Sequence, residues 1–230
     1  MARAARVDIG GQIYHVMNRA VGRLQIFNTD EDYLTFLNIL REAGETSVVE
    51  VLAYCCMPNH WHLVLRTKAD GDLGKYMHWL TNAHTRFVHT KTQTVGTGPL
   101  YQGRYKSFMV DDDIHLKTVI KYVERNAARA NLVVKPEDWR WGSAWLRMNG
   151  NIKQKKLLTE LPFEQINYFV WLNTIDTEKE LEQIRNSVKR GVPFGRERWV
   201  DAMVERYGLE STVRTKGRPK KGQVKVLANE

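Results

Sequence analysis

The sequence predicts an α+β protein, a ferredoxin-like βαββαβ sandwich with an antiparallel sheet, followed by a C-terminal helical extension and a basic tail. Stretches of alternating apolar residues, typical of half-buried strands, are interspersed with stretches in which apolar residues recur every three or four positions, typical of helices. Their order from the N-terminus is strand, helix, two strands, helix, strand. With 43% hydrophobic residues and seven Trp, the chain can also bury a substantial core.

Each element of the sandwich has its own signal. The first helix has an apolar face that includes Tyr33, Phe36 and Leu40. The second and third strands flank a Pro-Asn turn, and Asp72 is expected to cap the second helix. The expected ranges are 12–19 (strand), 30–42 (helix), 48–57 and 61–67 (strands), 73–91 (helix), 96–103 (loop), 105–110 (strand) and 113–130 (a further helix).

The C-terminal part of the chain differs in character. A helix is expected over 163–172, and Thr177 with Glu180 forms a capping-box signal for another that ends near Gly191. A third helix is expected over 196–207. The sequence leaves open whether these helices form a DNA-reading helix-turn-helix or an α-hairpin that packs on the core.

The tail is strongly basic. Residues 211–225 contain six Lys and Arg residues and no acidic residue. The tail is compatible both with an arm that reaches into the minor groove of DNA and with a solvated segment. Its candidate DNA contacts are Arg214, Lys216, Arg218, Lys220 and Lys221.

Charge and cysteine content narrow the function classes. Thirty-five Lys and Arg residues against 26 Asp and Glu residues give a net charge of +9, which favours a nucleic acid or another polyanion as partner. No apolar run approaches the roughly 20 residues that span a bilayer, so no membrane partner is expected. Cys55 and Cys56 are the only cysteines and fit neither a disulfide framework nor a zinc ribbon, which favours a reducing cytosol.

The most informative motif is the His-x-His pair formed by His60 and His62, which follows a Pro-Asn turn inside an apolar, β-prone run. Side chains alternate along a strand, so both imidazoles point to the same face. Two imidazoles at this spacing can clamp a divalent metal ion. The alternative is a pair of histidines on the solvated face of a half-buried strand.

A second polar stripe lies on the helix expected over 113–130. Tyr122, Asn126 and Arg129 are spaced i, i+4 and i+7, so they line one stripe beside the apolar face of that helix. A phenol, an amide and a guanidinium in this arrangement suit a nucleophile, a metal ligand and a phosphate clamp. By itself the stripe is equally compatible with a boundary tyrosine that has polar neighbours.

Four motifs in order resemble those of the REP-associated tyrosine transposases, which belong to the single-tyrosine HUH class of DNA-cleaving enzymes. They are Tyr14-His15-Val16, Met57-Pro58-Asn59-His60-Trp61-His62, Tyr101-Gln102-Gly103-Arg104-Tyr105-Lys106-Ser107 and Tyr122-Val123-Glu124-Arg125-Asn126-Ala127-Ala128-Arg129-Ala130. The stretches Arg185-Asn186-Ser187-Val188 and Gly191-Val192-Pro193-Phe194-Gly195, with Trp199, are also similar to the longer members, so the resemblance covers nearly the whole chain. The main departure is Ala127, where the family usually has Pro.

The resemblance implies a site and a domain division. Tyr122 would be the nucleophile, and His60, His62 and Asn126 would hold a divalent metal ion, Mg²⁺ or Mn²⁺. Candidate phosphate contacts are Arg104, Lys106, Arg125 and Arg129. The catalytic domain would span 1–150, a helical extension with possible DNA binding 151–210, and a basic flexible tail 211–230.

Other residues compete for these roles. Tyr101 and Tyr105 lie in a Gly-rich turn and the strand after it, without a liganding amide one helical turn away. His78, His84 and His89 share one expected helix, but no pair has the i, i+4 spacing that places two ligands on one face. His15 is expected either to support the site from behind or to pack in the core.

The residues and the resemblance together predict a metal-dependent transposase that cleaves and rejoins single-stranded DNA through a 5′-phosphotyrosine, and the resemblance implies that it acts at REP-type hairpins. The expected location is the cytoplasm of a bacterium, near the nucleoid, and the choice between monomer and homodimer stays open. Two alternatives remain: another HUH endonuclease, such as a relaxase or a replication initiator, and a non-catalytic nucleic-acid-binding protein. Relaxases often carry two tyrosines on the catalytic helix, where this chain has Tyr122 alone.

Overall fold

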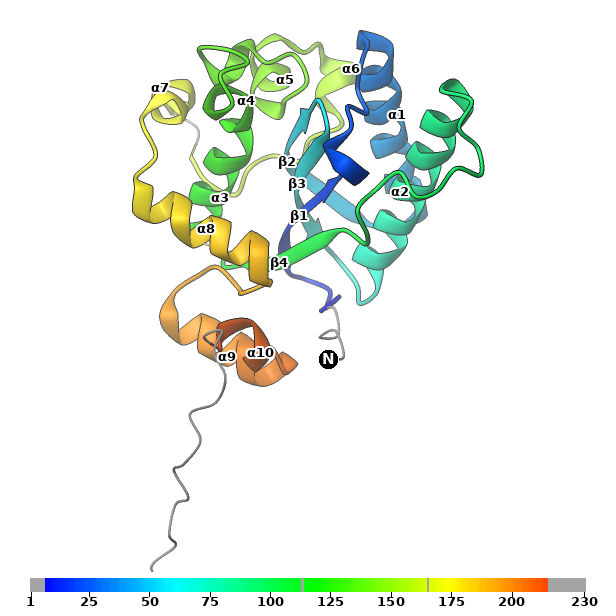
Figure 1. The fold of residues 1–230 in the computed structure, drawn as a ribbon. Coiled ribbons are helices and arrows are strands. Elements are labelled where there is room, and N and C mark those ends of the chain that lie inside the picture. The colour runs from blue at the N-terminus through cyan, green and yellow to red at the C-terminus, as the bar shows by residue number, and fades with distance from the viewer. Residues whose placement is uncertain (1–6, 113, 165, 215–230) are drawn as a thin grey trace, which may run out of the picture.

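The computed structural model describes the chain except for residues 1–6, 113, 165 and 215–230. The described strands form one sheet with helices on both faces (Figure 1). The strands are β1 (Ile13–Arg19), β2 (Val49–Met57), β3 (His60–Thr67) and β4 (Lys106–Val110). The helices up to residue 150 are η1 (Val21–Arg23), α1 (Asp30–Thr46), α2 (Asp72–Lys91), α3 (Ile114–Glu124), α4 (Asn126–Arg129), η2 (Pro136–Asp138) and α5 (Ser143–Asn149).

The strands lie in the order β2-β3-β1-β4, and every neighbouring pair is antiparallel. The α+β class and the antiparallel sheet expected from the sequence are confirmed. Side-chain alternation divides the buried residues into two cores. One contains Tyr14, Trp61 and Leu63 and packs against α1 and α2, and the other contains Val64 and Phe108 and packs against α3.

Helix ends follow the local sequence, with one correction. In α1, the Thr29 hydroxyl accepts a hydrogen bond from the backbone N–H of Asp32, whose carboxylate accepts one from the N–H of Thr29. The expected cap of α2 at Asp72 is wrong, because the cap position is Gly71, with a left-handed backbone (φ 82°). The chain turns sharply there between β3 and α2, and glycine adopts this conformation without strain. Asp72 instead accepts a hydrogen bond from the N–H of Ala69 at 2.8 Å.

The C-terminal extension consists of short helices packed on the sheet domain. They are α6 (Ile152–Lys155), α7 (Tyr168–Asn173), α8 (Glu178–Arg190), α9 (Glu197–Tyr207) and α10 (Glu210–Val213). The helix expected over 163–172 is shorter in the structure, because Asn167 has a left-handed backbone (φ 57°) and α7 begins only after it. The capping box at Thr177 and the left-handed C-cap at Gly191 are present as expected.

The contacts of the extension show that it packs against the sheet domain. Leu181 and Ile184 of α8 are buried in the core on the α3 side of the sheet. Phe194 forms a parallel bridge with Val110, so the extension also covers one end of the outer edge of β4. Whether these helices also read DNA stays a prediction. No helix among the described residues has both the length and the apolar character needed to cross a membrane.

Candidate active site

The sheet places His60 and His62 on the face that packs against α3. Their ring centroids are 5.1 Å apart, and the rings meet edge to face. In the antiparallel register, His62 pairs with Met17 of β1 and His60 pairs with Arg19. His15 of β1 points to the same face, with its ring 5.1 Å from that of His62. Alternation along two paired strands thus gathers three imidazoles at one place.

Each imidazole of the pair is oriented by a hydrogen bond through Nδ1. His60 Nδ1 lies 2.6 Å from the side-chain oxygen of Asn59, and His62 Nδ1 lies 2.9 Å from Nε2 of His15. Within the described ranges, Nε2 of neither His60 nor His62 has a hydrogen-bond partner. This is the usual arrangement of metal-binding histidines, in which one ring nitrogen binds the metal and the other is held by the protein.

Burial keeps these imidazoles neutral. Desolvation lowers the pKa of His15 to about 3, and desolvation together with the positive charge of Arg19 lowers that of His60 to about 4. The pKa of His62 is also well below its usual value, first because of burial and then because of its neighbouring imidazoles and guanidinium groups. Since only a neutral imidazole has the free electron pair that binds a cation, the pair is ready for a metal ion at neutral pH.

The donor set fits a divalent ion only if ligands other than these histidines contribute. Among the described residues, no group of three or more His, Cys, Asp and Glu side chains is arranged to hold a metal ion. Two imidazoles leave positions for oxygen donors such as an amide, water or a phosphate, a mixed set that Mn²⁺ and Mg²⁺ accept. The amide expected from the sequence as a ligand is that of Asn126, whose nitrogen is buried and has no hydrogen-bond partner in the described chain.

Tyr122 lies on α3 beside this histidine face. Its ring centroid is 6.0 Å from that of His62 and 6.2 Å from that of His15, both edge to face. The side chain is 8% exposed, so the phenol is enclosed on most sides. The guanidinium of Arg129 lies 4.2 Å from the ring centroid, within cation–π distance. The phenol ring therefore has both imidazoles and a cation as neighbours.

The prediction of a single helix over 113–130 is wrong, because the structure divides this segment into two helices. The structure ends α3 at Glu124 and begins α4 at Asn126, with Arg125 between them in a non-helical backbone (ψ 0°). Near this break, the guanidinium of Arg129 donates hydrogen bonds to the carbonyl of Tyr122 and to Oδ1 of Asn126, the latter at 2.9 Å. Tyr122, Asn126 and Arg129 still cluster, held by side-chain contacts as well as by helical spacing.

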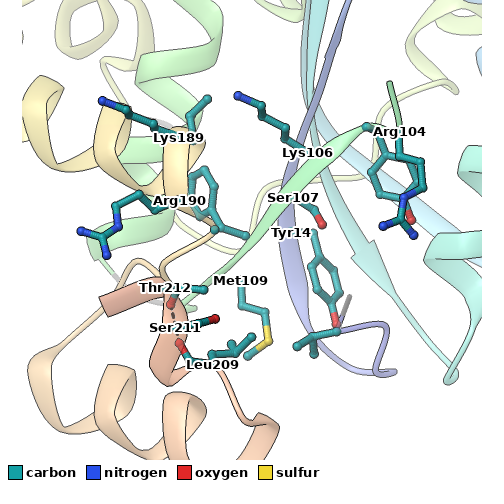
Figure 2. Close-up of a pocket in the computed structure, with 15 residues that line it drawn as sticks. Tyr14, Arg104, Lys106, Ser107, Met109, Lys189, Arg190, Leu209, Ser211 and Thr212 are labelled. Carbon is teal, nitrogen blue, oxygen red and sulfur yellow. Dashed lines mark hydrogen bonds between the residues drawn. The ribbon is translucent and has the colours of Figure 1, made fainter. Parts of the chain in front are cut away.

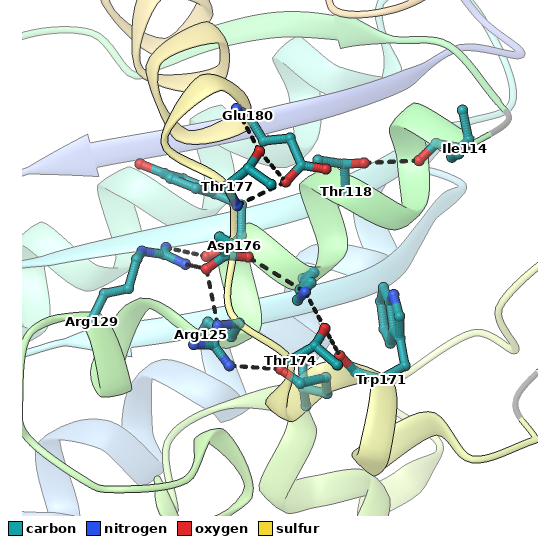
Figure 3. Close-up of polar contacts among 12 residues, drawn as sticks. Ile114, Thr118, Arg125, Arg129, Trp171, Thr174, Asp176, Thr177 and Glu180 are labelled. Carbon is teal, nitrogen blue, oxygen red and sulfur yellow. Dashed lines mark hydrogen bonds and ion pairs between the residues drawn. The ribbon is translucent and has the colours of Figure 1, made fainter.

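Arg125 and Arg129 form ion pairs with Asp176, a largely buried residue between α7 and α8. Nε of Arg125 is 2.9 Å from the carboxylate and Nη1 of Arg129 is 3.3 Å from it, with Lys121 at 3.9 Å (Figure 3). Arg125 also donates a hydrogen bond to the carbonyl of Leu172. The carboxylate is 8% exposed. A phosphate contact by either arginine would have to share or replace these ion pairs.

The other predicted DNA contacts lie apart from the histidines. Arg104 and Lys106 are exposed and line a pocket of about 310 Å³ between β4 and the C-terminal helices (Figure 2). Arg214 is exposed at the end of α10, and its carbonyl accepts a hydrogen bond from Arg190. The remaining tail contacts proposed from the sequence, Lys216, Arg218, Lys220 and Lys221, lie outside the described residues.

Two residues of the site do not stand out in the sequence. Arg19 lies opposite His60 in the register of β1 and β3, and its buried Nε has no hydrogen-bond partner in the described part of the chain. Asp176 organises the arginines around Tyr122 from a distant segment. The role of Arg19 could be found from a correct pairing of β1 with β3. Nothing local to Asp176 marks its role.

The sheet and α3 thus bring two imidazoles and an enclosed phenol together beside a guanidinium group. Residues 9–126, more than half of the chain, match the family model described as "Transposase IS200 like". The chain belongs to this family of transposases. The family match includes both histidines, Tyr122 and Asn126, and ends before the extension.

Two solved structures are similar to the chain. The first, described as a REP-associated tyrosine transposase bound to a REP hairpin, is 15% identical, with a TM-score of 0.55 over 71% of this chain and 92% of the other. The second, a putative transposase from Deinococcus radiodurans R1, is 20% identical, with a TM-score of 0.38 over 54% of this chain and 95% of the other. No curated protein matches the chain. The family model confirms the expected transposase, and the first structure supports the expected α+β fold with an antiparallel sheet.

Proposed function

We propose that this transposase is a metal-dependent DNA strand transferase that cleaves and rejoins single-stranded DNA through a 5′-phosphotyrosine on Tyr122. The observation that carries the proposal is the position of the Tyr122 ring, 6.0 Å from the ring of His62 on the face that also bears His60. The proposed nucleophile and the proposed histidine ligands thus come from separate elements of the fold and lie close together, which supports the proposal.

The proposed chemistry conserves the phosphodiester bond energy. The Tyr122 oxygen forms a bond to the scissile phosphorus, and the bond from that phosphorus to the 3′ oxygen breaks. The phenol gives up its proton to solvent, and the departing 3′ oxygen takes up a proton to become a hydroxyl group. Because one phosphate ester replaces another, the reverse attack by a 3′ hydroxyl can rejoin the ends without ATP.

His60 and His62 would hold the metal ion through Nε2, and Oδ1 of Asn126 would be the third protein ligand. The amide oxygen already accepts a hydrogen bond from Arg129 at 2.9 Å, but an amide oxygen has a second lone pair. When bound, a divalent ion supplies polarisation of the phosphoryl oxygens and offsets their charge in the transition state. With Nε2 on the metal, Nδ1–H of His60 would donate to the side-chain oxygen of Asn59 and Nδ1–H of His62 to Nε2 of His15, and these hydrogen bonds would orient the two imidazoles.

Two cations of the chain are placed to stabilise negative charge. Arg129 stacks on the Tyr122 ring and fixes the Asn126 amide, so it orients both groups. Arg19 lies beside His60, and no carboxylate partner of Arg19 is found among the described residues. Its guanidinium is thus available to bind a phosphate oxygen next to the metal ligands.

The proposed substrate is a DNA hairpin with flanking single-stranded bases. The similar structure with a TM-score of 0.55 is described as bound to a REP hairpin, and the net charge of +9 suits a polyanionic partner. In this proposal, residues 1–150 form the catalytic domain and 151–210 an accessory one. The reaction would take place in the cytoplasm, where bacterial DNA lies.

A labelled oligonucleotide tests the proposal. A hairpin with single-stranded flanks is incubated with the protein and Mn²⁺ or Mg²⁺, and the products are separated on a denaturing gel. We expect a protein-linked DNA band that requires the metal and is lost in Tyr122→Phe but kept in Tyr105→Phe. Cleavage that Tyr122→Phe leaves unchanged would rule out the proposed nucleophile.

A further inference from the structure

A basic groove runs along the outer edge of the sheet, outside the histidine site. It lies between β4 on one side and the ends of α8 and α10 on the other, with a volume of about 310 Å³ (Figure 2). Its cationic lining residues come from both walls: Arg104 and Lys106 from the β4 side, and Lys189 and Arg190 from α8. None of the described residues that line it is acidic.

The cations of the groove differ in their partners from those around Asp176. Arg104, Lys106 and Lys189 are exposed, and none of the three makes an ion pair with another described residue. Lys121, Arg125 and Arg129, by contrast, share the carboxylate of Asp176. Several cations that line one groove without a described carboxylate partner produce a positive potential that attracts an anion.

Hydrogen-bond donors and acceptors line the same groove. Ser107 and Ser211 contribute hydroxyl groups from opposite walls. Phe194 exchanges backbone hydrogen bonds with Met109 and Asp111 on the outer side of β4. Because alternate residues of a strand direct their peptide groups to the same side, the peptide groups of Ser107 also face outward, into the groove. The lining therefore combines charges and neutral polar groups, as a phosphate-binding surface does.

Lys106 connects the groove with the histidine face. In the sheet register, Lys106 lies opposite Met17, which lies opposite His62 on its other side. The three residues thus share one face, and Lys106 is two strands from His62, or about 10 Å at the usual strand spacing. A nucleic-acid backbone whose scissile phosphate lies at His62 would have its next phosphates within reach of Lys106.

We infer that this groove binds the phosphodiester backbone of the DNA that flanks the scissile phosphate. The inference rests on the proposed function for the identity of the polyanion. It assigns to the C-terminal extension, through Lys189, one wall of the DNA path. The region matched by the IS200-like family model ends at residue 126, so this wall is an addition to the shared catalytic part.

The test reverses one charge on each wall. Lys106→Glu and Lys189→Glu are made singly and together, with Lys179→Glu as a matched control, since Lys179 is an exposed residue at the other end of α8. Binding of a fluorescent DNA hairpin with single-stranded flanks is measured by anisotropy at several salt concentrations. The buffer contains EDTA, so that binding is separated from cleavage.

We expect each groove variant to weaken binding at least about fivefold at 0.1 M salt and the control to change it less than twofold. The slope of log K against log salt should fall by about 0.7–0.9 for each lost phosphate contact, and by about twice that in the double variant. Affinity and slope equal to those of the control in both groove variants would overturn the inference. A loss confined to Lys106→Glu would also overturn it, because the DNA would then avoid the α8 wall.

The binding result and the proposed function fail separately. If the unaltered protein binds the hairpin in the groove but forms no covalent DNA adduct with Mn²⁺, the proposed chemistry is wrong and the groove stands. If the adduct forms while Lys189→Glu binds like Lys179→Glu, the chemistry stands and the groove assignment is wrong.

Discussion

Asp176 offers the sharpest test of how the extension supports the site. Its carboxylate is 8% exposed and lies 2.9 Å from Arg125, 3.3 Å from Arg129 and 3.9 Å from Lys121. The variant Asp176→Ala removes the only carboxylate that pairs with these cations among the described residues and leaves their charges close together in a largely desolvated place.

Removing one partner of a buried ion pair costs about 3–5 kcal/mol, because the remaining charge is left uncompensated. The three cations retain 12–17% exposure of their side chains, so water screens part of the repulsion and the lower end applies, about 3 kcal/mol. For a chain of this length, that loss corresponds to a decrease in Tm of about 6–12 °C. Arg129 would also lose one of the contacts that hold it over the Tyr122 ring, and would keep its hydrogen bonds to the Tyr122 carbonyl and to Asn126.

Thermal and urea unfolding followed by circular dichroism measure the stability, with Glu178→Ala as the control. Glu178 is 87% exposed and lies 3.7 Å from Arg185 of the same helix, so its removal is expected to have little effect on stability. Cleavage at saturating DNA should be slower in Asp176→Ala, while hairpin binding in EDTA changes little. A free energy of unfolding within 1 kcal/mol of the unaltered protein would refute the reasoning.

Three further predictions follow from other parts of the structure. His62→Ala should weaken Mn²⁺ binding, measured by calorimetry, at least about tenfold, whereas the exposed His78→Ala should leave it unchanged; equal affinities would remove His62 from the metal site. Burial lowers the pKa of His84 to about 3. Below about pH 6.5 the unfolded chain therefore binds a proton at this residue that the native protein does not bind. As the pH falls, this difference should lower the free energy of unfolding by up to about 1.4 kcal/mol per pH unit. His84→Asn should reduce this slope in urea titrations between pH 4 and 7, and an unaltered slope would contradict the assignment. Glu124 is 1% exposed, accepts hydrogen bonds from Ser143 and Tyr168 at 2.5 and 2.6 Å, and forms an ion pair with Arg147 at 3.2 Å. Glu124→Ala leaves that guanidinium unpaired and should lower the free energy of unfolding by about 3–5 kcal/mol in urea. A loss below about 1 kcal/mol would show that this network is dispensable.

The sequence contains enough information for the parts of the site that depend on local periodicity. Alternation along one strand places His60 and His62 on one face, and the same rule sends Cys55 and Cys56 into different cores, as observed. These features follow from backbone geometry alone, so the surrounding fold cannot easily change them.

Features that depend on distant contacts could not be predicted in this way. Helical spacing groups Tyr122 with Asn126, but the interruption of the helix at Arg125 accompanies contacts to Leu172 and Asp176 in another part of the chain. The position of Arg19 beside His60 requires the register between β1 and β3, which no single strand specifies.

The central claim is that the Tyr122 oxygen becomes bonded to DNA phosphorus, and peptide mapping of the covalent adduct tests it most directly. Trypsin cleavage after Lys121 and Arg125 releases the tetrapeptide 122–125, which contains one tyrosine. After nuclease digestion, mass spectrometry should find the 5′-nucleotide on this peptide. A nucleotide attached to a peptide that contains Tyr101 or Tyr105 instead would contradict the account.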